Sequence, residues 1–182
     1  IAGRFRIKGE YVRVGTHIAP APEQVDRLID STLLEYTSDL NSYFLDKIGK
    51  FHLEFETIHP FNDGNGRIGR VLINYQLQRL GFSSVIVRDR EKKEYYQAFG
   101  DYRDGKNTKT IEKILMLGLI ESLHKRIAYL KGETIIPLAD YTKEHSLSGP
   151  ALSNAARRQK IPAFREKGVW KIPDNFKYQP RK

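Results

Sequence analysis

The sequence contains no cysteine among its 182 residues, which excludes disulfide frameworks, thiol catalysis and cysteine-bound zinc. It also has no apolar run of the roughly 18 residues that a membrane-spanning helix needs, so we expect no membrane partner. No signal-peptide pattern opens the chain. These features favour a cytoplasmic protein. Because the chain begins with Ile1 rather than Met, we also expect that upstream residues are missing from it.

The length suits one domain of ordinary size, or one domain with a small appendage, and the composition is that of a folded protein. Hydrophobic residues make up 40% and charged residues 29%, which excludes a fully disordered chain. The net charge is +9, and residues 137–182 carry +6 of it, from ten Lys and Arg against four Asp and Glu. Two interpretations follow for that segment: a solvated basic tail, or a surface for an anionic partner such as nucleic acid.

Apolar residues at helical spacing predict a mainly α-helical fold. Alternation over residues 4–18 predicts a β-hairpin, and residues 84–88 predict a short strand. The segment between Gly132 and Pro137 is the best domain boundary, so residues 1–132 form one domain, 133–136 a linker and 137–182 a second module. We expect helices at the following ranges: 25–36, 45–58, 65–80, 90–103 and 108–131.

The stretch HPFNDGNGRIGR, from His59 to Arg70, carries the strongest chemical signal. Gly64 and Gly66 flank Asn65 and allow backbone conformations that other residues avoid. A helix is expected to begin there, and its first N–H groups have no partner within the helix. Those N–H groups and the helix dipole form an anion-binding site.

The charged residues around this turn suit a nucleotide with its magnesium ion. Arg67 and Arg70 are three positions apart, so they share one helix face and can both reach a polyphosphate. Asp63 supplies a hard oxygen ligand for Mg²⁺, and His59 is a candidate general base. His52, by contrast, lies on an apolar helical stripe and is expected to be a core residue.

The same stretch resembles the signature of Fic-domain proteins, HPFx[D/E]GNGRxxR, at every defined position. The resemblance covers about residues 3–130. It implies a Fic-type helical bundle with a small β-hairpin flap, and AMP transfer from ATP to a Ser, Thr or Tyr hydroxyl of a target protein with release of pyrophosphate. Family members with Lys in place of Gly66 look suited to phosphate transfer, so Gly66 favours AMP transfer.

The resemblance also implies a role for each matching residue. His59 would deprotonate the target hydroxyl, Asp63 would ligate Mg²⁺, and Phe61 would anchor the loop in the core. The remaining positions would hold phosphate: Gly64, Asn65 and Gly66 as the anion hole, and Arg67 and Arg70 at the outer phosphates. Tyr95 and Tyr96 resemble the segment that closes the adenine pocket, with a core position as the alternative. The flap would pair with the target through Val12, Arg13, Val14, Gly15 and Thr16.

Many Fic proteins carry an inhibitory helix, [S/T]xxxE[G/N], and this sequence contains no such segment. The inhibitory element is therefore expected upstream of Ile1, on a separate partner, or nowhere. We therefore expect this chain to be a derepressed core that modifies itself strongly with Mg-ATP.

Residues 137–182 resemble winged helix-turn-helix modules of the excisionase type, with a helix, a turn, a second helix over 149–159 and a basic hairpin around Trp170. In such modules the second helix enters the major groove, and Arg157, Arg158 and Lys160 would contact DNA. Sequence reading by one copy is weak, so DNA recognition would require a homodimer. The alternative is a protein-binding or capping module.

Three functions remain open. The first is a protein adenylyltransferase that uses Mg-ATP. The second is a DNA-binding regulator whose loop is vestigial or senses nucleotide, and the third is a deAMPylase that uses the same loop. Intact His59, Asp63 and Arg70 favour the first.

Overall fold

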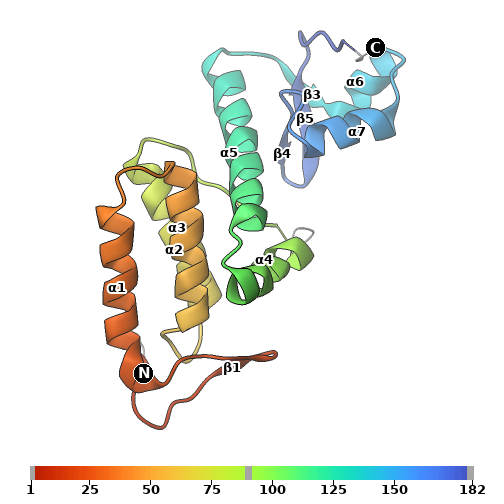
Figure 1. Ribbon diagram of the computed structural model, residues 1–182. Coiled ribbons are helices and arrows are strands. Elements are labelled where there is room, and N and C mark those ends of the chain that lie inside the picture. The colour runs from red at the N-terminus through yellow and green to blue at the C-terminus, as the bar shows by residue number, and fades with distance from the viewer. Residues whose placement is uncertain (1–2, 89–91, 180–182) are drawn as a thin grey trace. The chain divides into compact units, whose positions relative to one another are not determined.

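The computed structural model describes residues 3–88 and 92–179. The chain forms two compact units (Figure 1). The first consists of Ile1–Leu80 and Val87–Leu115, and the second of Gly81–Ile86 and Met116–Lys182. The expected mainly α-helical class is confirmed, because helices dominate the described residues and the strands among them are short. No helix within these residues is long and apolar enough to cross a membrane.

The first unit opens with a hairpin in which β1 (Arg13–Val14) pairs antiparallel with β2 (His17–Ile18). The 3-10 turn η1 (Pro22–Gln24) leads into the helices. Four helices then follow in order: α1 (Val25–Ser38), α2 (Phe44–Ile58), α3 (Asn65–Arg79) and α4 (Lys92–Gly105). The first turns of α5 (Lys109–Leu130), as far as Leu115, complete this unit.

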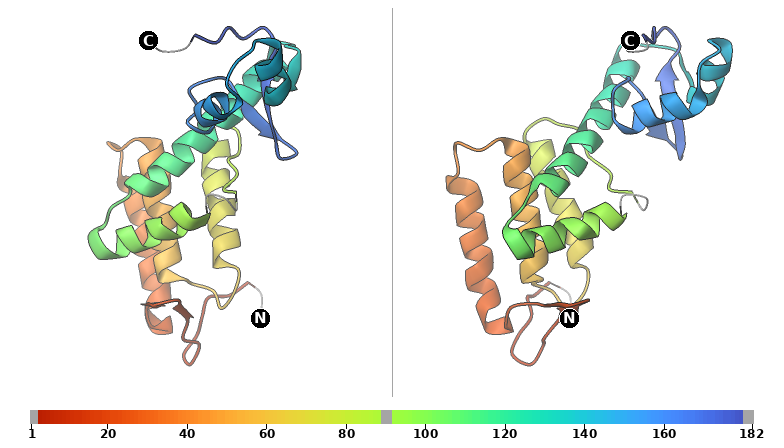
Figure 2. Two further views of the ribbon diagram at one scale, coloured as in Figure 1. Left: turned by 90° about the vertical axis from the view of Figure 1, so that its right-hand side faces the viewer. Right: turned by 45° about the vertical axis from the view of Figure 1, so that its right-hand side comes forward.

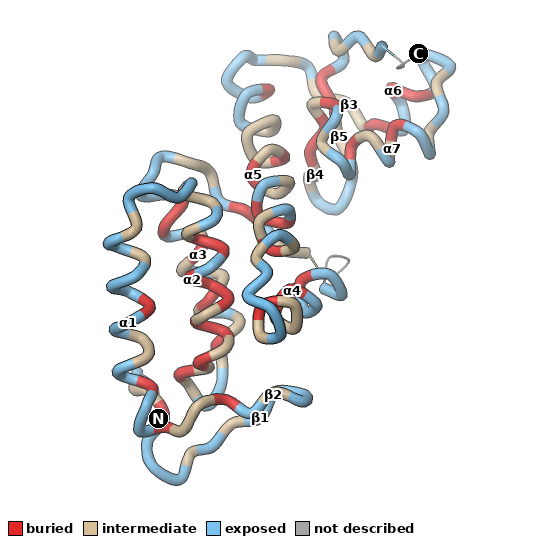
Figure 3. The backbone as a smooth tube through the Cα atoms, viewed as in Figure 1, coloured by how far each residue is buried: buried red, intermediate tan, exposed pale blue. Residues whose placement is uncertain are grey.

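Helix α2 is the centre of the first unit and contacts α1, α3 and α4 (Figure 2). Ile48, His52 and Leu53 on α2 have no exposed surface, and most of the helix is buried or partly buried (Figure 3). At Gly49 a Cβ atom would lie only 3.1 Å from Cγ2 of Ile111, so glycine permits the close approach of α5. The packed core thereby fixes α2, whose C-terminal end leads into the loop that begins at His59.

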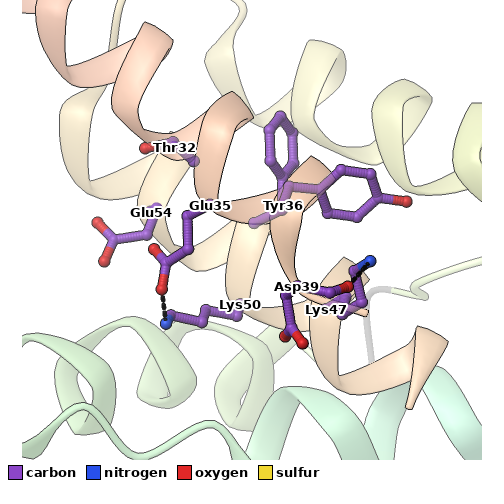
Figure 4. A pocket seen from close by; sticks show the side chains of 8 residues that line it. Thr32, Glu35, Tyr36, Asp39, Lys47, Lys50 and Glu54 are labelled. Atoms are coloured by element: carbon purple, nitrogen blue, oxygen red, sulfur yellow. Dashed lines mark hydrogen bonds and ion pairs between the residues drawn. The ribbon is translucent and has the colours of Figure 1, made fainter. Parts of the chain in front are cut away.

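A small pocket between α1 and α2 is lined mostly by charged and polar side chains (Figure 4). Lys50 pairs with Glu35, and Lys47 donates to the backbone carbonyl of Asp39. Lys47 also lies over the ring of Tyr36, 5.0 Å from its centroid. Because these charged groups already satisfy one another, the pocket is a contact between two helices and adds nothing to the functional site.

The second unit combines a three-stranded antiparallel sheet, in the order β3-β5-β4, with two short helices. Ser148 caps the second of these helices by accepting a hydrogen bond from the amide of Ala151. The elements are β3 (Ile135–Pro137), α6 (Leu138–Glu144), α7 (Gly149–Arg157), β4 (Phe164–Glu166) and β5 (Val169–Pro173). Their shared core consists of Leu138, Tyr141, Leu152, Ala156, Ile161, Ala163 and Ile172.

Most of the predicted helices are confirmed, but the strands predicted over residues 4–18 and 84–88 differ from those in the structure. The hairpin expected over residues 4–18 is limited to β1 and β2, because residues 4–10 form hydrogen bonds in a turn and with the loop after α2. The strand expected over 84–88 is wrong: the described chain there forms no strand, and Val85 packs on Gly118 of α5 instead. The helix expected from Arg90 is described from Lys92, and its first predicted residues lie outside the described ranges.

The predicted domain boundary does not coincide with the boundary between the two compact units. Ile135 and Ile136, placed in the linker 133–136, belong to β3 and pair with β5. The two compact units divide within α5, between Leu115 and Met116. The C-terminal hairpin is confirmed as β4 and β5, but Trp170 is only partly buried. Arg165 on the facing strand stacks over its ring, 4.0 Å from the ring centroid.

Candidate active site

The loop between α2 and α3 is held in a defined shape by its own side chains. Asn65 is almost fully buried, and its amide oxygen accepts from the Phe61 amide at 2.9 Å while its amide nitrogen donates to the Phe61 carbonyl at 2.7 Å. Phe61 packs edge-on against Phe5 with ring centroids 5.2 Å apart, and also lies near Phe55. Because these two hydrogen bonds occupy the Asn65 side chain, its backbone N–H is the group that it can offer to an anion.

The N-terminus of α3 forms the turn that the sequence predicts. Gly64 has φ of 85°, a left-handed conformation that glycine adopts without penalty, and its carbonyl accepts from the amides of Arg67 and Ile68, both at 3.0 Å. The helix therefore starts sharply at Asn65, and its first N–H groups and dipole provide an anion site.

His59 lies where α2 ends, and its environment suits a base. Its backbone adopts the left-handed conformation, with φ of 52° and ψ of 61°. Its Nδ1 lies 3.3 Å from the Glu56 carbonyl oxygen, an atom that only accepts, so Nδ1 carries the proton and Nε2 keeps a free lone pair. Burial lowers the pKa of His59 below its ordinary value, the hydrogen bond to the Glu56 carbonyl opposes this shift, and the positive charges of Arg6 and His17 add to it.

An open cleft brings Asp63, Gly64 and Arg67 together. The Asp63 carboxylate is 92% exposed; it accepts from the Gly64 amide at 2.7 Å and pairs with Arg67 at 3.2 Å. Mg²⁺ is typically held by one or two carboxylates together with substrate phosphates, and an exposed carboxylate beside an anion site fits that requirement. Among the described residues, His59 and Arg70 are not part of the cleft lining.

Behind the loop, Arg70 and Glu56 occupy space that Gly66 leaves open. A Cβ atom on Gly66 would lie 3.3 Å from Nη1 of Arg70 and 3.8 Å from Oε1 of Glu56. Burial raises the pKa of Glu56 to about 7, although the positive charge of Arg70 opposes the shift. The Glu56 carboxyl therefore holds a proton for much of the time at neutral pH, and its Oε2 lies 3.9 Å from Nδ1 of His59.

Tyr95 does not match the predicted adenine contact. It is 3% exposed and packs with Phe99 and His52, and its hydroxyl forms a hydrogen bond with Nε2 of His52 at 2.7 Å. Burial also raises the pKa of Tyr95. Tyr96 is 54% exposed and remains available as a contact. The expectation that His52 belongs to the core is confirmed, because it is fully buried and burial lowers its pKa to about 3.

The flap residues predicted to bind a target lie at the surface. Val12 is partly buried, and the remaining members, Arg13, Val14, Gly15 and Thr16, are exposed. Next to them His17 contacts the carbonyl of Thr57 through Nε2 at 2.8 Å, which ties the hairpin to the last turn of α2. The hairpin is therefore attached to the same helix end that presents His59.

Arg157, Arg158 and Lys160, the predicted DNA contacts, lie at the end of α7 and just after it, and all three are exposed. They belong to the second unit, so the structure groups them with the sheet and helices of that unit and not with the loop around His59.

Residues 1–77, which include the loop described above, match the Fic/DOC family. The chain contains a Fic/DOC domain. A Fic domain-containing signaling protein from Bacteroides thetaiotaomicron has a similar crystal structure, with a TM-score of 0.63 and 25% identity over 72% of this chain and 56% of that one.

Two curated relatives extend the match beyond the Fic/DOC domain. A probable protein adenylyltransferase of Aquifex aeolicus is 30% identical over 91% of this chain and 59% of its own length. Protein adenylyltransferase Fic of Nematostella vectensis is 31% identical over 75% of this chain and 31% of its own length. The chain thus spans less than two thirds of either relative.

Two residues of the Fic/DOC domain were not predicted as part of the site. Arg6 contacts the end of α2 from a position 53 residues away in the sequence, so no local pattern indicates it. Glu56 lies three positions before His59 on one helix, and that spacing was a signal that could have identified it.

Proposed function

We propose that this chain is a protein adenylyltransferase that moves AMP from Mg-ATP to a Ser, Thr or Tyr hydroxyl of a target protein and releases pyrophosphate. Two curated relatives carry this activity in their names. The observation that carries the proposal is that His59 and the helix N-terminus at Asn65 lie on the same short loop. A base beside an anion site is what hydroxyl attack on a phosphate ester requires.

In the proposed reaction, Nε2 of His59 accepts the proton of the target hydroxyl while the hydroxyl oxygen forms a bond to the α-phosphorus. The bond between that phosphorus and the bridging oxygen breaks, and pyrophosphate leaves. Arg67 and Arg70 would hold its negative charge, and the amides at the start of α3 would hold the α-phosphate. Asp63 would bind Mg²⁺, which supplies charge neutralisation for the phosphates when bound.

Label transfer tests this reaction directly. With ATP radiolabelled at the α-phosphate we expect labelled protein, and with label at the γ-phosphate we expect none. Label from the γ-phosphate alone would support a kinase-like reaction, and label from neither position would contradict transfer. Mass spectrometry of a lysate incubated with the chain and ATP would identify the modified protein.

The variant H59A tests the base. We expect transfer to fall by about 10²-fold or more, because a general base contributes roughly 10²–10⁴-fold, while ATP binding persists. In the unaltered protein the rate should rise with pH as His59 loses its proton, with a midpoint below the ordinary value of 6.5 because burial lowers this pKa. A pH–rate profile without a rise between pH 5 and neutrality would argue against His59 as the base.

DNA binding by the second unit is a second candidate function, and one observation favours it. Three exposed basic residues, Arg157, Arg158 and Lys160, lie at the end of α7, in a β-α-α-β-β arrangement closed by the β4–β5 hairpin. Cationic side chains at a helix surface of this kind suit phosphate contacts. Fluorescence anisotropy with a labelled duplex would detect such binding, and its absence at low salt would exclude it.

A further inference from the structure

Arg6 is the most completely engaged polar side chain near the loop. It is 3% exposed, and its guanidinium donates to four backbone carbonyls. Two of these carbonyls belong to residues on either side of the β1–β2 hairpin, Glu10 at 3.0 Å and Pro20 at 2.9 Å. The other two end helix α2, Ile58 at 3.1 Å and His59 at 2.8 Å.

The backbone of Arg6 adds a fifth contact, because its amide donates to the carbonyl of Pro60 at 2.9 Å. One residue of the N-terminal segment therefore bonds to three consecutive residues, Ile58, His59 and Pro60. The last carbonyls of a helix have no partner within it, so a donor from elsewhere satisfies groups that would otherwise lose hydrogen bonds on burial.

The conformation of His59 carries a free-energy cost that such an external restraint can offset. A side chain other than glycine costs about 1–2 kcal/mol in the left-handed region, and such a conformation persists only when its surroundings impose it. The Arg6 contact on the His59 carbonyl acts at the residue that carries this strain.

We propose that Arg6 is a positioning residue that holds the backbone of His59 in its left-handed conformation and joins it to the segments on either side of the β1–β2 hairpin. The imidazole and the target-binding strand then keep a fixed relation to each other. This inference rests on the proposed function for its catalytic meaning, whereas the positioning itself can be tested without any activity.

Lysine is the informative substitution at this position. R6K keeps the positive charge, but its single ammonium group lacks the planar set of five donors with which guanidinium reaches carbonyls in several directions. It therefore removes most of the restraint while leaving a cation nearby. R27K is the matched control, because Arg27 is an exposed residue of α1.

The first measurement is the titration of the His59 ring by NMR, together with hydrogen exchange of residues 10–20. The groups that face this ring are Arg6 and His17 from the N-terminal segment and Glu56 from α2. In R6K we expect the His59 pKa to move up toward its ordinary value and exchange of the flap to rise at least about threefold. Both should stay unchanged in R27K. A folded R6K with unaltered titration and unaltered exchange would overturn the proposal.

A measurement on the unaltered protein covers the case in which R6K does not fold. A guanidinium bonded to four carbonyls should give an Nε–H resonance for Arg6 that exchanges slowly with water. An Arg6 Nε–H that exchanges as fast as that of an exposed arginine would also overturn the proposal.

Steady-state kinetics of R6K distinguish a positioning role from a role in nucleotide binding. We expect R6K to lower kcat for AMP transfer at least tenfold and to change KM for ATP less than threefold, because α3 carries the phosphate site. A raised KM with unaltered kcat would contradict a positioning role. If the unaltered protein transfers no AMP, the proposed function fails, and the NMR and exchange results still decide the role of Arg6.

Discussion

At the scale of single residues, Glu56 has an unusual place in the site. Its side chain is 8% exposed, and its Oε1 has no hydrogen-bond partner within the described structure. Burial disfavours the charged form and raises the pKa to about 7, even with the positive charge of Arg70 nearby. Near neutral pH the Glu56 carboxyl is therefore only partly ionised, and because the pKa of His59 is lowered by burial, their 3.9 Å approach is not a full ion pair.

This shift predicts a pH-dependent stability. The Glu56 pKa is higher in the folded chain than the ordinary 4.5, so the fold favours the protonated form and loses stability as pH rises through about 7. E56Q imitates the protonated carboxyl at every pH. Urea denaturation should therefore give equal stabilities for both proteins at pH 4, and a more stable E56Q by up to about 3 kcal/mol at pH 9. An equal difference at both pH values would contradict this account.

At the scale of elements, the packing of α3 against α2 depends on a missing side chain. A Cβ atom on Gly69 would lie 2.7 Å from Oε1 of Glu56 and 2.8 Å from Cε1 of His52. Both neighbours are buried on α2, so neither can move freely away. Gly100, inside α4, has no atom within 4 Å of the same position.

The two glycines therefore predict opposite effects of alanine. G69A should destabilise the chain by about 1–3 kcal/mol, because the added methyl group overpacks the contact between α2 and α3. G100A should stabilise it by about 0.5–1 kcal/mol, because alanine favours a helix interior over glycine. Thermal or urea unfolding at neutral pH measures both changes in stability. A gain of stability in G69A would contradict overpacking of the contact between α2 and α3.

The sequence predicts elements well where their determinants are local. The turn at Gly64 and the helix that starts at Asn65 follow from adjacent residues, and both are confirmed. The role of Arg6 could not be predicted, since its partners lie 52 and 53 positions away. The three-residue strand β3 also escaped prediction, because only its pairing with β5 distinguishes it from a linker.

At the scale of the whole molecule, charge is distributed unevenly between the two units. Residues 137–182 hold +6 of the net charge of +9, and all of them belong to the second unit. Within this unit Glu166, which is already counted in that sum, pairs with Lys125 and Lys171. Arg157, Arg158 and Lys160 at the end of α7 are exposed, and they are the contacts that the proposed DNA binding would use.

The triple variant R157Q/R158Q/K160Q tests that surface. If each residue contacts a phosphate, the slope of log K against log salt concentration should fall in magnitude by roughly 3 and affinity for duplex DNA should drop. The control R27Q/K93Q/K109Q removes the same charge from exposed residues of the first unit and should leave the slope unchanged. Equal losses in both variants would mean that net charge alone attracts DNA.

The left-handed backbone at position 59 has a consequence for why a histidine is found there. Glycine would adopt φ of 52° without steric conflict, whereas any residue with a Cβ atom is disfavoured. The conformation does not by itself select histidine, because Lys106, Ser146, Gln159 and Lys167 also have φ near 50°. Under the proposed function, the ability of the ring to accept a proton accounts for histidine at this position, and contacts from neighbouring segments offset the conformational penalty.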